Sequence, residues 1–150
     1  MSTIAAEVAH TSLLPGLLKT ISANKKMPLP HKLLEVSDVV LRDDKMEVGA
    51  RNNHRLCAVY ANKPAGFEII HGLVDRILLL LEVPWSPSKD KSQYYLRTAD
   101  DPTFFPQRCA EIVCYGEVIG KMGVLQPDVL SKFELNISCS AMSINIEPFL

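Results

Sequence analysis

The stretch RCAEIVCYGEVIGKMGVL, residues 108–125, decides the fold. It reads as two strands, Arg108–Tyr115 and Val118–Leu125, which are joined through Gly116-Glu117, a Gly-x pair suited to a tight hairpin turn. Strands joined this closely pair antiparallel, because parallel strands need a long crossover connection. The hairpin therefore predicts an antiparallel sheet.

Further elements follow outward from this hairpin. Apolar runs between turn residues predict strands at Lys32–Leu41, His54–Ala61, Gln93–Thr98 and Met142–Glu147. Apolar residues at helical spacing predict helices from Ser12, as the cap, to Asn24, over Phe67–Leu81 and over Pro127–Phe133. The charged segment Arg42–Asn53 reads as a loop or hairpin connection. The fold class is α+β, an antiparallel sheet flanked by helices, in a single domain over residues 1–150.

Composition narrows the class of protein. The 150 residues are 47% hydrophobic, and 16 Lys+Arg against 17 Asp+Glu give a net charge of −1. A nucleic-acid-binding module normally shows a clustered basic surplus, so this balance counts against one. No basic-then-apolar leader opens the chain, and the longest apolar run, Ile77–Leu81, is far below the roughly 20 residues that span a bilayer. We expect a cytoplasmic protein without membrane contact.

The four cysteines predict neither a metal site nor a disulfide framework. No pair of Cys57, Cys109, Cys114 and Cys139 has Cys-x-x-Cys spacing, so buried reduced thiols are expected. The odd spacing of Cys109 and Cys114 within one strand places them on opposite faces. His54, the only local base for a Cys57 nucleophile, is also an odd number of residues away, which makes that pairing weak.

One helix carries a possible site. Glu68, His71 and Asp75 lie at i, i+3 and i+7 on one face, and Glu-x-x-His is a spacing used by di-metal carboxylate bundles. Those bundles need further carboxylates from other helices, and no second copy of the motif occurs. The simpler interpretation is a solvated helix face. The spacing of Gly116, Gly120 and Gly123 does not fit a nucleotide-binding loop, so close strand packing is the better account of these glycines.

Several longer strings carry a resemblance that covers the chain from about residue 3 onward. They are TSLLPGLLKTISANKKMPLPHKLLEVSDVV (Thr11–Val40), GFEIIHGLVDRI (Gly66–Ile77), DPTFFPQRCAEI (Asp101–Ile112), GEVIGKMGVLQPDVLSKFEL (Gly116–Leu135) and INIEPFL (Ile144–Leu150). In this order the strings resemble the C-terminal portion of the β subunit of phenylalanine–tRNA ligase, of the eukaryotic and archaeal type.

The resemblance implies a fold similar to the catalytic core of class II aminoacyl-tRNA synthetases, in a catalytic-like module that has no catalytic residues of its own. A working class II site needs an Arg-x-Glu pair and a Gly-rich third motif with an arginine. Here Arg108 and Glu111 form Arg-x-x-Glu, and Ser138–Glu147 contains neither Gly nor Arg. The chain would be a structural and assembly module, with no cofactor or metal of its own, while the holoenzyme uses ATP and magnesium.

The implied partners are the α subunit, a second heterodimer in an α2β2 assembly, and tRNA through the holoenzyme. Leu13–Val40 resembles the first class II motif, which serves subunit contacts. We therefore expect an interface on the apolar stripe of the first helix, with Leu17→Glu sparing the fold more than Val74→Glu. The stripe residues are Leu13, Leu14, Leu17, Leu18 and Ile21.

Three positions depart from the family pattern. His10 stands where Arg is usual, Gln107 replaces the Gly of Phe-Pro-Gly-Arg, and Gln126 replaces His before Pro127. Two other interpretations remain open. One is a stand-alone interaction module that has kept the fold. The other is a small enzyme that uses His71 and Asp75, or His54 with a neighbouring carboxylate.

Overall fold

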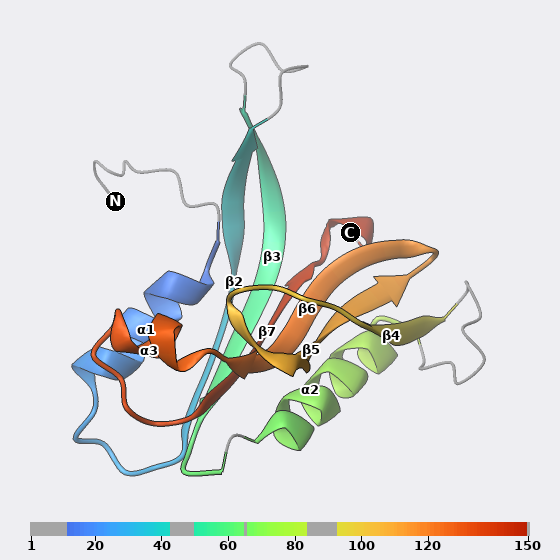
Figure 1. Ribbon diagram of the computed structural model, residues 1–150. Coiled ribbons are helices and arrows are strands. Elements are labelled where there is room, and N and C mark those ends of the chain that lie inside the picture. Colours follow the sequence, from blue (N-terminus) through green and yellow to red (C-terminus); the bar gives the residue numbers. More distant parts are fainter. Residues whose placement is uncertain (1–11, 43–49, 65, 84–92, 150) are drawn as a thin grey trace.

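The computed structural model describes residues 12–42, 50–64, 66–83 and 93–149. Within these residues, ten elements follow one another (Figure 1). They are α1 (Leu14–Ala23), β2 (His31–Arg42), β3 (Ala50–Ala61), α2 (Phe67–Leu80), β4 (Tyr94–Thr98), β5 (Phe104–Cys114), β6 (Glu117–Leu125), α3 (Pro127–Ser131), β7 (Cys139–Asn145) and the 3-10 helix η1 (Glu147–Phe149).

The strands form one six-stranded sheet in the order β2-β3-β7-β6-β5-β4, with every neighbouring pair antiparallel. The last strand, β7, lies between β3 and β6 and so joins the β2–β3 hairpin to the β5–β6 hairpin. The predicted α+β fold with an antiparallel sheet is confirmed. β2 and β4 form the two edges.

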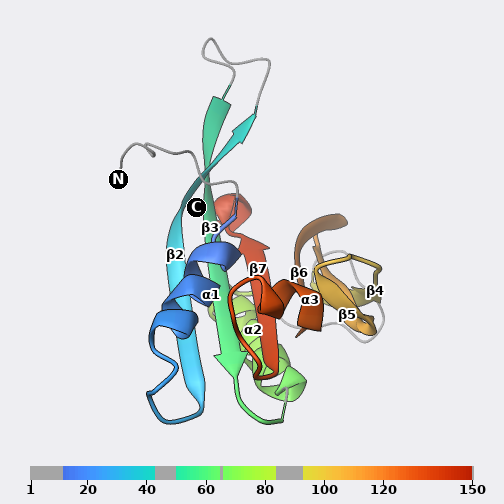
Figure 2. The same cartoon turned by 60° about the vertical axis from the view of Figure 1, so that its left-hand side comes forward.

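Helices cover both faces of the sheet, as the two views show (Figures 1 and 2). α1 and α3 pack on one face, where Leu18 and Ile21 meet Cys57 and Val59 of β3 in a buried apolar cluster. α2 packs on the other face, where Ile70, Val74 and Leu78 meet Met122, Met142 and Ile144. Alternate residues of a strand face opposite sides, so the four central strands β3, β7, β6 and β5 contribute to both clusters. The fold therefore has three layers.

The first helix ends where its sequence predicts, but its N-cap is Leu13, with no side-chain cap, rather than Ser12. The Ser12 hydroxyl oxygen accepts a hydrogen bond from the Leu14 N–H at 3.3 Å, and Pro15 lies in the first turn, where a missing N–H costs nothing. Asn24 ends the helix, with its side-chain amide donating to the Thr20 carbonyl at 2.7 Å. The chain then passes through a cis Leu29–Pro30 bond into β2. None of the helices in the described residues is long and apolar enough to cross a membrane.

The predicted boundaries differ from the structure in several places. Tyr115 and Gly116 form the β5–β6 turn, with φ of 55° and 79°, and Cys114 pairs with Glu117. Two positive φ angles are typical of a type I′ turn, so the turn lies one residue earlier than Gly116-Glu117. Residues 50–53 belong to β3 rather than to a loop, and residues 43–49 lie outside the described residues. β7 starts at Cys139 instead of Met142, and the chain leaves it for η1.

Two glycines of β6 lie against the backbone of neighbouring strands. A Cβ at Gly120 would meet the Ser143 carbonyl of β7, and a Cβ at Gly123 would meet the Arg108 carbonyl of β5. The expectation that these glycines serve close strand packing is confirmed. They allow β6 to lie between its two neighbours without a side chain pushing into the hydrogen-bonded ladder.

Candidate functional site

A row of polar side chains crosses the face of the sheet that carries α1. The strand register places Ser143 of β7 opposite Lys121 of β6, Lys121 opposite Glu111 of β5, and Glu111 opposite Arg97 of β4. Residues paired in this way point to the same face. We call Arg97, Glu111, Lys121 and Ser143 the polar row.

Ion pairs occupy most of the charges along this row. Arg97 donates two hydrogen bonds to one Glu111 carboxylate oxygen, at 3.0 and 2.8 Å. Lys121 donates to the Asp101 carboxylate at 2.8 Å, and Asp101 also accepts the Thr103 N–H at 2.9 Å. Burial alone would raise the pKa of Asp101, but these donors outweigh it and hold that pKa below its ordinary value. The carboxylates therefore neutralise two of the cations on this face.

Arg55 stands beside the row on β3. Its guanidinium donates to the Ser143 hydroxyl at 3.2 Å, and the side chain is half-buried. Burial lowers the pKa of Arg55 from its ordinary value, although an arginine stays protonated in proteins. A cavity of about 350 Å³ opens at this point, with Arg55 and Lys121 in its lining.

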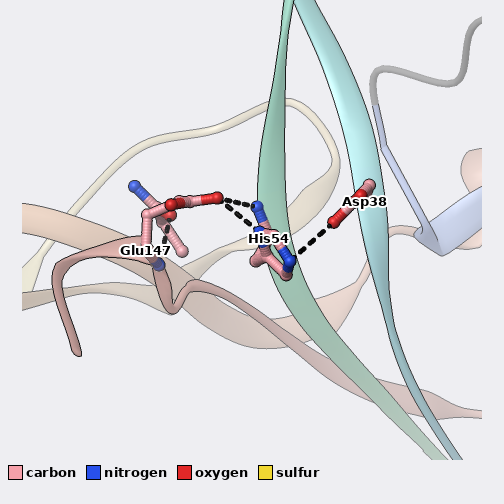
Figure 3. A network of polar contacts seen from close by, with 4 residues as sticks. Asp38, His54 and Glu147 are labelled. Atoms are coloured by element: carbon pink, nitrogen blue, oxygen red, sulfur yellow. Dashed lines mark hydrogen bonds and ion pairs between the residues drawn. The ribbon is translucent and has the colours of Figure 1, made fainter. Parts of the chain in front are cut away.

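His54 lies on the opposite face of the sheet, between two carboxylates (Figure 3). Its Nε2 is 3.1 Å from an Asp38 oxygen on β2, and its Nδ1 is 2.5 Å from a Glu147 oxygen in η1. The same Glu147 oxygen accepts the His54 backbone N–H at 2.8 Å. His54 thus has neighbouring carboxylates, as the small-enzyme interpretation would require, while enzymatic use of them stays a prediction. All three side chains are more than a third exposed, and the arrangement ties η1 to the β2–β3 hairpin.

This network makes a pH-dependent contribution to stability. The hydrogen bond to Glu147, together with the charges of Asp38 and Glu147, raises the pKa of His54 above its ordinary value of 6.5. A raised folded-state pKa means that the stabilisation is fully present below the unfolded pKa and is lost as pH rises through the folded one. We expect Glu147→Gln to lower the pKa of His54 more than Asp38→Asn does, measured by NMR titration of the imidazole. Equal pKa values in Glu147→Gln and wild type would contradict the network.

The predicted stripe on α2 does not gather into a site. Asp75 accepts a hydrogen bond from the Tyr94 hydroxyl at 2.9 Å and so fixes β4 against the helix. Burial, then the bond to Asp75, raises the pKa of Tyr94. The His71 ring lies against Phe67, with centroids 6.4 Å apart, and Glu68 is exposed. Within the described residues, no three or more His, Cys, Asp and Glu side chains group as metal ligands do. The structure gives the small-enzyme interpretation no support here.

All four cysteines are buried, as expected. Cys109 belongs to the cluster under α1 and Cys114 to the cluster under α2, which confirms that they point to opposite faces. Cys57 likewise faces α1, away from His54. Burial raises the pKa of Cys57 to about 12 and that of Cys114 and Cys139 to about 11. Thiols of this kind are poor nucleophiles at neutral pH.

The apolar stripe of α1 is packed into the protein, contrary to the expectation that part of it would be left in water. Leu13, Leu17, Leu18 and Ile21 are buried against the sheet and α3, and only Leu14 is partly exposed. The stripe is wide because two elements cover it, the sheet and the segment around Leu130 and Leu135. The burial of Leu17 therefore predicts that Leu17→Glu unfolds the chain instead of sparing the fold. Contact of α1 with another subunit stays a prediction.

The positions that depart from the family pattern can now be placed. Gln107 has a φ of 64°, a left-handed backbone that favours glycine, in the irregular part of β5 between Phe104 and Cys109. Gln126 is the N-cap of α3, and its backbone carbonyl accepts the Val129 and Leu130 N–H groups. His10 lies outside the described residues. Arg108 is exposed, and Glu111 is bound by Arg97 rather than by Arg108.

Sequence reasoning missed the polar row and Arg55. Their side chains come from five strands that are up to 88 residues apart in the chain, and no local spacing connects them. The predicted hairpin, with its turn at Gly116-Glu117, would place Glu111 opposite Met122, whereas the observed register places it opposite Lys121. The remaining contacts depend on β7 lying between β3 and β6, which the sequence pattern did not indicate.

Comparison with known proteins identifies the family. A family model described as "Phenylalanyl tRNA synthetase beta chain CLM domain" matches residues 3–146. The chain is 59% identical over 144 residues to the human phenylalanine–tRNA ligase beta subunit, covering 96% of this chain and 24% of that one. The Drosophila melanogaster beta subunit is 56% identical over 148 residues, with 99% and 25% covered.

A relative in Arabidopsis thaliana, named as the cytoplasmic beta subunit, is 40% identical over 151 residues, with 96% of this chain and 25% of the relative covered. The chain thus spans about a quarter of the length of these relatives. The narrower expectation of a place at the C-terminal end of the subunit is not supported by these matches. The chain belongs to the phenylalanyl-tRNA synthetase beta chain CLM domain family.

Proposed function

We propose that the chain is a non-catalytic structural and assembly module of a phenylalanine–tRNA ligase beta subunit. It supports the alpha subunit, which charges tRNA with phenylalanine in an ATP-dependent reaction. The observation that carries this proposal is the family match over residues 3–146, together with 59% identity to the human beta subunit. The wider assembly, with a second heterodimer and tRNA, and a cytoplasmic location like that named for the plant relative belong to the same proposal.

The fold is consistent with a class II synthetase core. That core is an antiparallel sheet flanked by helices, which is the arrangement of this chain. Its first motif runs from a helix through a proline-containing link into a strand, and α1, the link through Pro28 and Pro30, and β2 follow that order. This order of elements supports the proposed likeness to a class II core.

The charges on the polar row support a non-catalytic role. Binding the phosphates of ATP requires positive charge that is positioned and available. Here Glu111 binds Arg97, and Asp101 binds Lys121. ATP and magnesium would therefore act at the alpha subunit, with no cofactor in this module.

The surface that we propose for the alpha subunit lies between β2 and α2. A groove of about 480 Å³ runs there, and its lining includes Lys32 and Leu34 of β2, Tyr60 of β3, and Ile69 and Leu73 of α2. We call it the β2–α2 groove. Leu34 is 56% exposed and Ile69 is half exposed, and exposed apolar side chains that gather around one groove are typical of protein-binding surfaces.

Two further features favour this groove over α1. Val36, 54% exposed, continues the apolar face of β2 beyond Leu34, and β2 is an edge strand of the sheet. An edge strand offers backbone donors and acceptors to a partner. The groove therefore replaces the α1 stripe as the proposed interface, because the α1 leucines are already used in the core.

Catalytic silence is the first test. We expect the purified chain to give ATP–pyrophosphate exchange at background with phenylalanine present, because its row cations are paired. Arg108→Ala, which changes an exposed residue, should leave that background unchanged. Exchange above background that disappears in Arg108→Ala would contradict the proposal.

A further inference from the structure

The cavity beside the polar row contains Arg55, a cation that the assembly role does not explain. About 350 Å³ in volume, it lies on the α1 face between β3, β7 and β6, and the segment around Asp101–Phe104 closes one side. Its size is in the range of cavities that hold small organic ligands. Arg55 and Ser143 belong to its polar side, and Leu14, Phe104 and Ala141 contribute apolar surface.

Arg55 is the one cation of this cavity that has no carboxylate partner among the described residues. Lys121 is paired with Asp101, and Arg97, outside the cavity, is paired with Glu111. Among the described residues, Arg55 makes a single hydrogen bond, to the Ser143 hydroxyl, so most of its five N–H donors have no acceptor in that part of the chain. Partial burial of a guanidinium without an anionic partner costs desolvation free energy, and a bound anion would offset that cost.

The chemistry of the neighbours fits an anion. Because Lys121 neutralises Asp101, the net charge of the described lining residues is that of Arg55. The Ser143 oxygen accepts from Arg55, which leaves its hydroxyl hydrogen free to donate to a ligand oxygen. A planar guanidinium binds carboxylate and phosphate oxygens bidentately, which a lysine does not.

We propose that this cavity binds a small organic oxyanion, with its carboxylate or phosphate on Arg55 and Ser143 and its apolar body against Phe104 and Leu14. The cavity is larger than an inorganic ion requires, and its lining combines the polar side around Arg55 and Ser143 with apolar surface from Leu14 and Phe104. The proposal does not depend on assembly with the alpha subunit.

Titration of the 150-residue chain with three probes of similar shape tests this site. Benzoate and phenyl phosphate carry the two oxyanions on an apolar ring, and benzamide is the neutral control. We expect saturable backbone amide shifts at Gly120, Lys121 and Ser143 with at least one anion, and at least tenfold weaker binding of benzamide. Whichever anion binds more tightly identifies the oxyanion. Benzamide binding as tightly as both anions, or no saturable shift with either anion at millimolar concentration, would overturn the proposal.

Two arginine variants provide the matched comparison. Arg55→Gln should weaken the preferred anion at least tenfold, whereas Arg97→Gln, outside the cavity, should leave its affinity unchanged. Thermal melting of both variants checks the fold, and if Arg55→Gln melts early, Arg55→Lys replaces it. The lysine keeps the charge and loses the planar fork, so we expect weakened binding. Unchanged affinity in a folded Arg55→Gln, or in Arg55→Lys where it is used, would refute the role of Arg55.

Discussion

Gly120→Ala should lower the free energy of unfolding by about 3 kcal/mol, the largest effect that we expect from adding a single methyl group. The added Cβ would lie 2.1 Å from the Ser143 carbonyl oxygen and 3.0 Å from the Ile144 Cα. Both atoms belong to the backbone of β7, which is hydrogen-bonded to β6 and cannot move away alone. Urea denaturation monitored by circular dichroism measures the change.

Gly72→Ala is the matched control. Gly72 lies within α2, and a Cβ there would meet nothing within 4 Å. Alanine is the better helix former, so the same substitution should raise stability by up to about 1 kcal/mol. A Gly120→Ala protein as stable as Gly72→Ala would show that β6 and β7 are not packed as described.

Leu17→Glu and Val74→Glu should both unfold the chain, each at a cost of at least about 3 kcal/mol. Leu17 is 6% exposed in the cluster under α1, and Val74 is 0% exposed in the cluster under α2. A carboxylate at either position would be buried without a partner. Thermal melting and near-ultraviolet circular dichroism measure the loss of tertiary packing.

Leu80→Glu is the control for this pair, because Leu80 is 73% exposed at the end of α2. Its melting temperature should stay within a few degrees of the wild type. If Leu17→Glu melts like Leu80→Glu while Val74→Glu unfolds, α1 is not part of the core and the earlier expectation of an exposed stripe would be restored.

Local patterns predicted the elements well, since each depends on residues close in sequence. The helical spacing of Leu14, Leu17, Leu18 and Ile21 gave α1 within a residue of its ends, and the helix from Phe67 was placed almost as closely. The pairing of β5 with β6 followed from their short connection. These features are set by side-chain periodicity and turn chemistry, which a single sequence contains.

Long-range order was harder to predict. Burial of the α1 stripe depends on α3 and the segment after it, more than 100 residues later in the chain, so the local sequence did not show what covers the stripe. Gln107 was noted as a departure from a family glycine, but its left-handed φ of 64° explains why glycine suits that position. The polar row required the insertion of β7, which no local signal predicts.

The affinity of this chain for the alpha subunit tests the assembly role most directly. Isothermal titration calorimetry would compare the wild type with Leu34→Glu in the β2–α2 groove and with Leu80→Glu, an exposed leucine outside the groove lining. We expect wild type and Leu80→Glu to bind alike. Leu34→Glu should remain folded and bind about 30-fold more weakly, a loss of about 2 kcal/mol. No binding by the wild type, or equal binding by a folded Leu34→Glu, would contradict the account.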